Sequence, residues 1–134
     1  MIYRIKPIVD TQTIITAPGV VVEKPVSFLG DVDKDSGVLV QPDSKLRGTR
    51  LTGKVFFAPT GRGSTVGSYI IYALKTSGLS PAAIVMHKAE PIIITGAVIS
   101  GIPLFEGMPI EFYRKPRIID KVTIKPGGVV EVFE

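Results

Sequence analysis

The residues best suited to chemistry lie in one short stretch, residues 59–68, which reads PTGRGSTVGS. The stretch is expected to open a helix, and the first N–H groups of a helix lack internal partners and attract anions. Gly63 allows backbone conformations that other residues resist. Arg62 adds a permanent charge that can hold a carboxylate or phosphate through paired hydrogen bonds. The stretch is therefore predicted to bind an anion, and a plain tight turn with Ser64 as a helix cap is the alternative that remains open.

Three familiar motifs do not fit this stretch. A P-loop ends in Gly-Lys-Ser or Gly-Lys-Thr, but Gly67 is followed directly by Ser68. A dinucleotide fingerprint reads G-x-G-x-x-G, and the spacing of Gly61, Gly63 and Gly67 is one residue too long. A nucleophile elbow reads G-x-S-x-G, whereas Ser64 follows Gly63 immediately. The loop therefore belongs to none of these three classes.

Alternating aspartates over residues 31–37, DVDKDSG, could suggest a calcium loop. An EF-hand needs Gly at its sixth position and Glu at its twelfth, and Ser36 and Pro42 stand there instead. No helical pattern flanks the segment. A polar hairpin turn is the preferred interpretation.

The inventory of metal ligands is small, because the chain has no cysteine and one histidine, His87. Iron–sulfur clusters are held by Cys thiolates, so this chain cannot ligate one alone, and a site with several histidines is excluded. His87 could act as a general base in principle. It has no visible orienting partner, which favours a surface role.

One clear helix should position the loop, running from Thr65 to Thr76. Ser64 precedes it as a candidate N-cap, and Gly78 follows as a stop signal. A second, short helix is expected at Gly96–Ser100. The apolar residues predicted to form the buried face of the first helix are Val66, Tyr69, Ile70, Ala73 and Leu74.

The rest of the chain is rich in β-branched residues and turn formers, which predicts short strands. With one principal helix, a β-rich α/β domain of layered β/β/α type fits better than a doubly wound sheet, which needs several crossover helices. We expect a single domain over residues 1–134. The predicted strands are Tyr3–Pro7, Gly19–Val22, Gly37–Val40, Gly53–Phe57, Ala83–Val85, Ile92–Thr95, Ile110–Tyr113, Lys121–Ile124 and Val129–Phe133.

Charge and hydropathy exclude two classes of partner. The net charge is +4 and the basic residues are scattered, with the longest cluster at residues 114–117, so nucleic-acid binding is not expected. The longest uncharged apolar stretch, Pro91–Phe105, is too short and too interrupted to span a bilayer. The first ten residues read as a strand and not as a signal peptide. A cytoplasmic protein is the resulting expectation.

The loop and its surroundings resemble the small subunit of the aconitase X family, with good agreement from about Val26 to Leu104. The loop itself, residues 59–69, carries the signature PTGRGSTVGSY. The further matching segments are SFLGDVD at 27–33, DSG at 35–37, GKV at 53–55, AEPII at 89–93, GA at 96–97 and IPL at 102–104.

The resemblance implies a fold, a partner and a reaction. The family's small subunit is similar to the swivelling domain of aconitase, and a large subunit carries the iron–sulfur cluster, expected to be of 4Fe–4S type, so the site forms between the two. Archaeal members dehydrate (R)-5-phosphomevalonate to trans-anhydromevalonate 5-phosphate in a modified mevalonate route to isoprenoids. Bacterial relatives include dehydratases of cis-3-hydroxy-L-proline. A small phosphorylated hydroxy acid is the expected substrate.

By the same resemblance, Ser64 corresponds to the family's proton acceptor, and we place Arg62, Gly63 and Thr65 in substrate binding. Dehydration needs a base for the proton and a Lewis acid for the departing hydroxyl, which the partner's cluster would supply. A serine oxygen is a poor base unless its anion is stabilised, and helix N–H groups with the Arg62 charge are suited to that.

Two positions depart from the family pattern. Asp31 stands where many relatives have a second Gly, and Thr65 stands where some relatives, particularly bacterial ones, have Cys. The second departure favours the archaeal activity. The alternatives left open are a related dehydratase for another hydroxy acid, a non-catalytic anion-binding module and, last, a serine hydrolase that would use His87 as its base.

Overall fold

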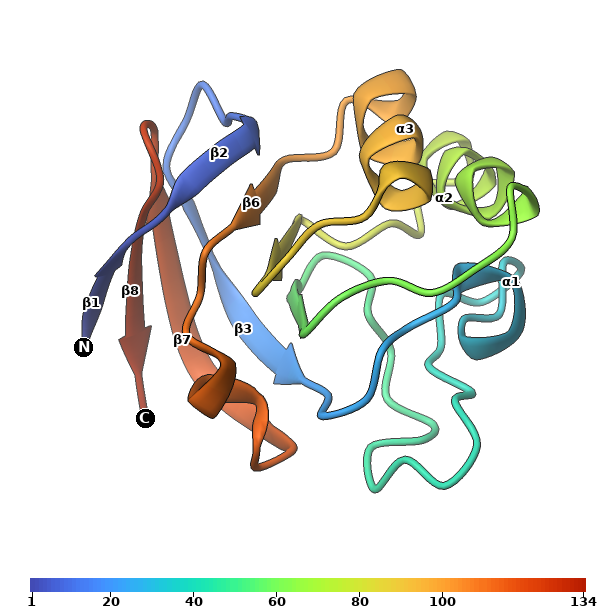
Figure 1. The fold of residues 1–134 in the computed structure, drawn as a ribbon, viewed down its shortest axis with the longest axis horizontal. Coiled ribbons are helices and arrows are strands. Elements are labelled where there is room, and N and C mark those ends of the chain that lie inside the picture. The colour runs from blue at the N-terminus through green and yellow to red at the C-terminus, as the bar shows by residue number, and fades with distance from the viewer.

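The computed structural model describes residues 1–134 and is built on one eight-stranded mixed sheet (Figure 1). The strand order is β1-β8-β7-β3-β4-β5-β6-β2. Strands β3 to β6 run parallel to one another, and the other neighbours pair antiparallel. The strands are β1 (Ile2–Arg4), β2 (Lys6–Val9), β3 (Ile15–Val21), β4 (Val55–Ala58), β5 (Ala83–Met86), β6 (Leu104–Glu106), β7 (Arg117–Lys125) and β8 (Val129–Phe133).

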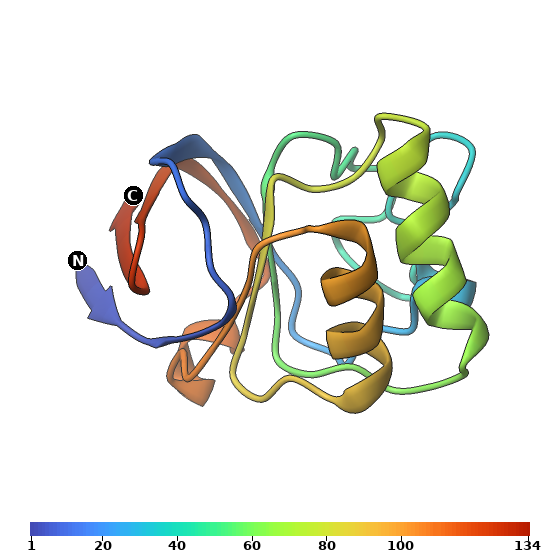
Figure 2. The ribbon, with the colours of Figure 1, turned by 90° about the horizontal axis from the view of Figure 1, so that it is seen from above.

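The sheet curls until it nearly closes, because its two edge strands, β1 and β2, are consecutive in the chain. Only Ile5 separates them, and its N–H donates to the carbonyl of Gly128 at 2.8 Å. Gly128 has a φ of +92°, and a Cβ there would lie 2.0 Å from the Ile5 carbonyl oxygen. Glycine is therefore required at this approach of two backbones. Figure 2 shows the N-terminal segment curving round beside β8 to complete the ring.

Two helices of similar length, α2 (Val66–Thr76) and α3 (Pro91–Ser100), lie side by side on one face of the parallel strands (Figures 1 and 2). Each helix connects one parallel strand to the next, as parallel pairing requires a crossover. Gly96 of α3 packs on Ile71 and the backbone of Ser68, which brings the helices close together. A short helix α1 (Phe28–Asp31) and a 3₁₀ turn η1 (Ile110–Tyr113) complete the elements.

The core is divided into two by the sheet. Phe56 and Ala58 of β4 belong to the cluster beneath the helices, whereas Val55 and Phe57 belong to the cluster inside the curled sheet. All four residues of β4 are buried. Burial on both faces explains why β4 and β5 read as continuous apolar runs without alternation.

The predicted strand at Val129–Phe133 is confirmed with its bounds, and the predicted strands over residues 3–7, 19–22, 53–57, 83–85 and 121–124 overlap observed ones. The strand expected at Ile92–Thr95 is wrong, because these residues belong to α3. The side chain of Glu90 caps this helix by accepting from its first N–H groups, Pro91 stands in its first turn and Gly101 ends it with a φ of 68°. These end signals outweigh the β preference of the isoleucines and extend the helix expected at Gly96–Ser100 toward its N-terminus.

Two other predicted strands are also wrong. Residues 110–113 form the 3₁₀ turn η1, in which the buried Tyr113 hydroxyl donates to the carbonyl of Val85 at 2.9 Å. Burial raises the pKa of Tyr113, so the hydroxyl remains a neutral donor. Residues 37–40 make only isolated bridges, Val38 with Arg50 and Leu39 with Val32. Tertiary contacts, not strand pairing, organise both segments.

The helix after the loop is confirmed, but its buried face is rotated from the predicted one. Gly67, Ile71 and Leu74 are buried, whereas Val66 and Tyr69 are 42% and 73% exposed. Gly67 packs on Ile92 of α3. A Cβ added to Gly67 would lie 3.4 Å from Cγ2 of Ile92. The small residue Gly67, which is not part of the predicted apolar face, is the one that faces the neighbouring helix.

Candidate functional site

The Arg62–Ser64 loop lies where three loops meet at the carboxyl ends of parallel strands. It follows β4, and Gly61 makes a parallel bridge with Val26, which follows β3. The Arg62 N–H donates to the Val26 carbonyl at 2.9 Å. On the other side, the N–H of His87, which follows β5, donates to the carbonyl of Pro59 at 3.0 Å. Crevices at this edge of open α/β sheets are the usual place for ligand sites.

The loop holds several backbone donors free of internal partners. The N–H groups of Gly63, Ser64 and Thr65 donate to no atom of the chain. Gly63 has a φ of +151°, a conformation that favours glycine. Free N–H groups before a helix, in a backbone bent by glycine, form the kind of concave site that binds anions.

Ser64 is half-buried, and its Oγ accepts a hydrogen bond from the N–H of Val66 at 3.2 Å. Its carbonyl accepts from the N–H of Gly67 at 2.8 Å. The helix begins at Val66, one residue later than expected, and Thr65 at its N-cap position makes no side-chain capping bond. Ser64 instead lies just before the N-cap and bonds the N–H of the first helical residue, Val66. A backbone donor on Oγ is also the interaction that would stabilise a serine alkoxide.

Arg62 is exposed, yet its guanidinium is tied at one corner to a buried carboxylate. Its Nη2 lies 3.5 Å from Oδ2 of Asp31, and the two side chains are 61% and 2% exposed. The same Oδ2 accepts from the N–H of Ser27 at 2.8 Å and from Nε2 of Gln41 at 3.3 Å. In the sequence, Asp31 stands out only as one of the alternating aspartates and as a departure from the family pattern. Nothing in the spacing of Asp31 and Arg62 indicates this contact.

A second carboxylate, Glu90, supports the loop from the opposite side. It accepts from the N–H groups of Ile92 at 3.0 Å and Ile93 at 2.9 Å, which caps α3. A Cβ on Gly61 would lie 2.7 Å from Cγ of Glu90 and 2.5 Å from Cδ1 of Ile93. The start of α3 is therefore occupied by protein groups, whereas the donors before α2 remain open.

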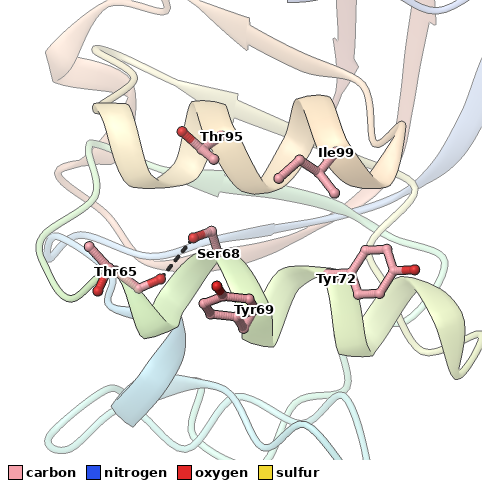
Figure 3. Close-up of a pocket in the computed structure, with 6 residues that line it drawn as sticks. All are labelled: Thr65, Ser68, Tyr69, Tyr72, Thr95 and Ile99. Carbon is pink, nitrogen blue, oxygen red and sulfur yellow. Dashed lines mark hydrogen bonds between the residues drawn. The ribbon is translucent and has the colours of Figure 1, made fainter.

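A groove of ≈ 370 Å³ runs between α2 and α3 and begins at the loop (Figure 3). At its near end, Ser68 Oγ donates to the Thr65 carbonyl at 2.8 Å. None of its lining side chains is charged, and neither Arg62 nor Ser64 is among them, so the groove itself offers no charged group to an anion. The lining residues are Thr65, Ser68, Tyr69, Tyr72, Thr95 and Ile99.

The other candidates from the sequence lie apart from this chemistry. In residues 33–37, the Ser36 hydroxyl donates to Asp33 at 2.6 Å and lowers the pKa of that carboxylate, as expected of a polar turn. His87 is exposed, and its Nδ1 lies 2.9 Å from the carbonyl oxygen of Met108. It makes no hydrogen bond with Ser64, so the contact that a serine hydrolase needs is missing.

The side chains that can ligate a metal do not gather in one place. There is no cysteine, and no group of three or more His, Asp or Glu side chains is placed to hold a metal ion. The residues present do not fit an iron–sulfur cluster, which requires thiolate ligands. No helix is both long enough and apolar enough to cross a membrane.

A nearly closed sheet, a helical layer and a serine-bearing loop at the carboxyl ends of the parallel strands define a swivelling domain. The model of the aconitase X swivel domain matches residues 2–132, and the chain belongs to that family.

Similar proteins cover almost the whole chain. The phosphomevalonate dehydratase small subunit of Pyrococcus abyssi is 48% identical over 91% of this chain and 92% of its own length. The phosphomevalonate dehydratase small subunit of Aeropyrum pernix is 45% identical over 98% of this chain and 92% of its own length. The crystal structure of Thermococcus kodakaraensis aconitase X in its holo form superposes with a TM-score of 0.88 at 38% identity, covering 100% of this chain and 99% of that one. The expected family and fold class are confirmed.

Proposed function

We propose that this chain is the small subunit of a phosphomevalonate dehydratase and that, together with a large subunit, it removes water from (R)-5-phosphomevalonate to give trans-anhydromevalonate 5-phosphate. The observation that carries the proposal is the open donor loop around Ser64 in a chain that matches phosphomevalonate dehydratase small subunits over nearly its full length. The name of these relatives supports a large-subunit partner for this chain as well.

In this proposal Ser64 takes the proton from the carbon next to the substrate carboxylate. Its Oγ lies at the start of α2 and already accepts from the Val66 N–H. The helix dipole and the free N–H groups of the loop favour negative charge at this position. These features lower the free-energy cost of forming the serine anion. Without them, a serine hydroxyl in water is too weak a base to remove this proton.

Arg62, Gly63 and Thr65 bind the substrate. The guanidinium is exposed on the side away from Asp31 and can donate to a carboxylate or phosphate. Gly63 and Thr65 contribute unpaired N–H groups rather than side chains. The substrate carries both kinds of anion, and the groups on this chain suit one anionic end of it.

The iron–sulfur cluster belongs to the large subunit in this proposal, since this chain lacks its ligands. Bound there, it supplies the Lewis acidity that helps the hydroxyl leave. The residues of this chain hold the substrate against that partner and move the proton at Ser64 Oγ. The complete site therefore lies between two chains.

The test is to co-purify the chain with its large subunit and to measure dehydration of phosphomevalonate and of cis-3-hydroxy-L-proline by the same preparation. Turnover of phosphomevalonate, at least tenfold preferred in kcat/KM, is the expected result. Preference for cis-3-hydroxy-L-proline would move the chain to the related dehydratase. A stable complex that turns over neither substrate would contradict the proposed reaction.

A further inference from the structure

Asp31 is the most unusual charged group in the chain, because its carboxylate is almost completely buried. Its side chain is 2% exposed, at the end of α1. A buried carboxylate is strongly disfavoured unless it is paired and hydrogen-bonded. Arg62 is the one cation that contacts it. The pairing of these two residues therefore needs an explanation beyond a surface ion pair.

The carboxylate is held in place independently of the arginine. Its Oδ2 accepts from the backbone N–H of Ser27 at 2.8 Å and from Nε2 of Gln41 at 3.3 Å. Gln41 is itself buried, and its Nε2 also donates to the carbonyl of Pro25 at 3.0 Å. Asp31 is thus a fixed anchor, whereas Arg62 is the exposed and flexible partner. The fixed carboxylate of Asp31 therefore restricts the conformations of the Arg62 side chain, and not the reverse.

The contact restricts one corner of the guanidinium and leaves the others available. Nη2 of Arg62 lies 3.5 Å from Oδ2, and Nε and Nη1 make no hydrogen bond within the chain. A long, exposed arginine otherwise samples many rotamers, and it must give up that freedom when it binds an anion. An anchor that selects the binding rotamer in advance removes part of this cost.

We propose that Asp31 is a positioning residue that orients Arg62 over the Ser64 loop for binding the anionic group of the substrate. The proposal rests on the proposed function, in which Arg62 binds substrate. Asp31 touches neither substrate nor the reacting proton in this role. It acts through Arg62 alone, which distinguishes it from a residue that merely stabilises the loop.

The first test removes the negative charge of Asp31 while keeping the shape of its side chain. Asp31→Asn, assembled with the large subunit, should lower kcat/KM about tenfold or more, chiefly by raising KM, since small misplacements of a binding group cost up to about a hundredfold. Asp33→Asn is the matched control, because Asp33 lies in the neighbouring turn and bonds Ser36 instead of Arg62. Equal kinetics for the two variants would overturn the proposal.

A double variant separates positioning from general support of the loop. In an Arg62→Ala background there is no cation to orient, so Asp31→Asn should cost a clearly smaller factor in kcat/KM than it does in the wild-type background. The same factor in both backgrounds would mean that Asp31 acts independently of Arg62, and the proposal would fail.

A spectroscopic measurement needs neither turnover nor a variant. In the ¹⁵N-labelled full chain, the guanidinium signals of Arg62 should show slowed rotation, unlike those of Arg47, which is exposed and makes no side-chain hydrogen bond. Matching, freely averaged signals for both arginines would refute the anchoring even where Asp31→Asn fails to fold. Slowed rotation in a complex without dehydratase activity would instead contradict only the proposed function.

Discussion

Gly61 and Glu90 touch so closely that a Cβ on the glycine would lie 2.7 Å from both Cγ and Oε1 of the glutamate. Glu90 is at the same time the cap of α3, through the N–H groups of Ile92 and Ile93. The loop that precedes α2 is therefore seated directly on the cap of α3. A side chain added at Gly61 would therefore collide with the residue that caps α3.

Gly61→Ala should accordingly displace the Glu90 cap or the loop. We expect a loss of about 1–3 kcal/mol in the free energy of unfolding, the usual range for an overpacked site, together with reduced turnover in the complex. Gly30→Ala is the control, since no atom lies within 4 Å of a Cβ there. Thermal unfolding of both variants checks the expectation, and equal stability would contradict the close contact.

Ser64→Ala tests the proton acceptor. Turnover in the complex should fall by about 10²–10⁴-fold, the usual contribution of a positioned base. Stability should fall by only about 1 kcal/mol, because the variant loses the cap on the Val66 N–H. Ser68→Ala, which removes a nearby hydroxyl bonded to Thr65, should keep most of the activity. A Ser64→Ala complex that assembles and retains more than about a tenth of its turnover would exclude Ser64 as the base.

Arg62→Lys keeps a positive charge but removes the planar array of donors. We expect a higher KM and a loss of about tenfold or more in kcat/KM, because a lysine cannot bind an anion through two parallel N–H groups. Steady-state kinetics of the complex measures this. Arg47→Lys, at an exposed position elsewhere, should leave the kinetics unchanged. Near-normal kinetics for Arg62→Lys would limit Arg62 to a structural role.

Dependence on the partner gives a prediction about metal. Purified alone and incubated with iron and sulfide under reducing conditions, the chain should bind no cluster and dehydrate nothing, since it has no cysteine. The complex reconstituted in the same way should hold iron and be active. Metal analysis and the characteristic visible absorption distinguish the two preparations, and a cluster on the isolated chain would contradict the assignment to the partner.

The chain terminus carries a small pH-dependent contribution to stability. Glu134 accepts from Arg117 at 2.6 Å, and this hydrogen bond lowers the pKa of Glu134 below its ordinary 4.5. The stabilisation is therefore present above pH 4.5 and lost as the pH falls through the lowered value. Glu134→Gln should cost less than about 1 kcal/mol at pH 7, as for exposed ion pairs, and progressively less as the pH falls below 4.5. Unfolding of both proteins over a series of pH values from 7 downward tests this, and a pH-independent loss would rule it out.

The sequence was sufficient for the loop, the helix after it and the family, because these depend on local signals. The glycines, Arg62 and Ser64 lie within a few residues of one another, and the apolar period of α2 is strong. The end of that helix at Thr76, with Ser77 as its C-cap and Gly78 in a left-handed conformation, also follows from local preference.

What the sequence missed depends on contacts between distant residues. The isoleucines after Pro91 have the β preference of a strand, but the Glu90 cap and Pro91 start a helix there. The apolar spacing predicts that Tyr69 is buried, but it is exposed. The side of α2 that faces α3 is instead set by small residues such as Gly67. The ion pair of Asp31 with Arg62 joins two loops that only the sheet brings together. Contacts of this kind produce no repeating pattern in the sequence from which they could be predicted.

The near-closure of the sheet by β1 and β2 also has a consequence for the isolated chain. An open sheet presents unpaired backbone groups along its edges, which recruit strands of other molecules and lead to aggregation. Here both edge strands come from one N-terminal segment, they are only 3 and 4 residues long, and Pro7 interrupts the second. A subunit that must exist, however briefly, before it meets its partner is thereby protected against self-association through its sheet.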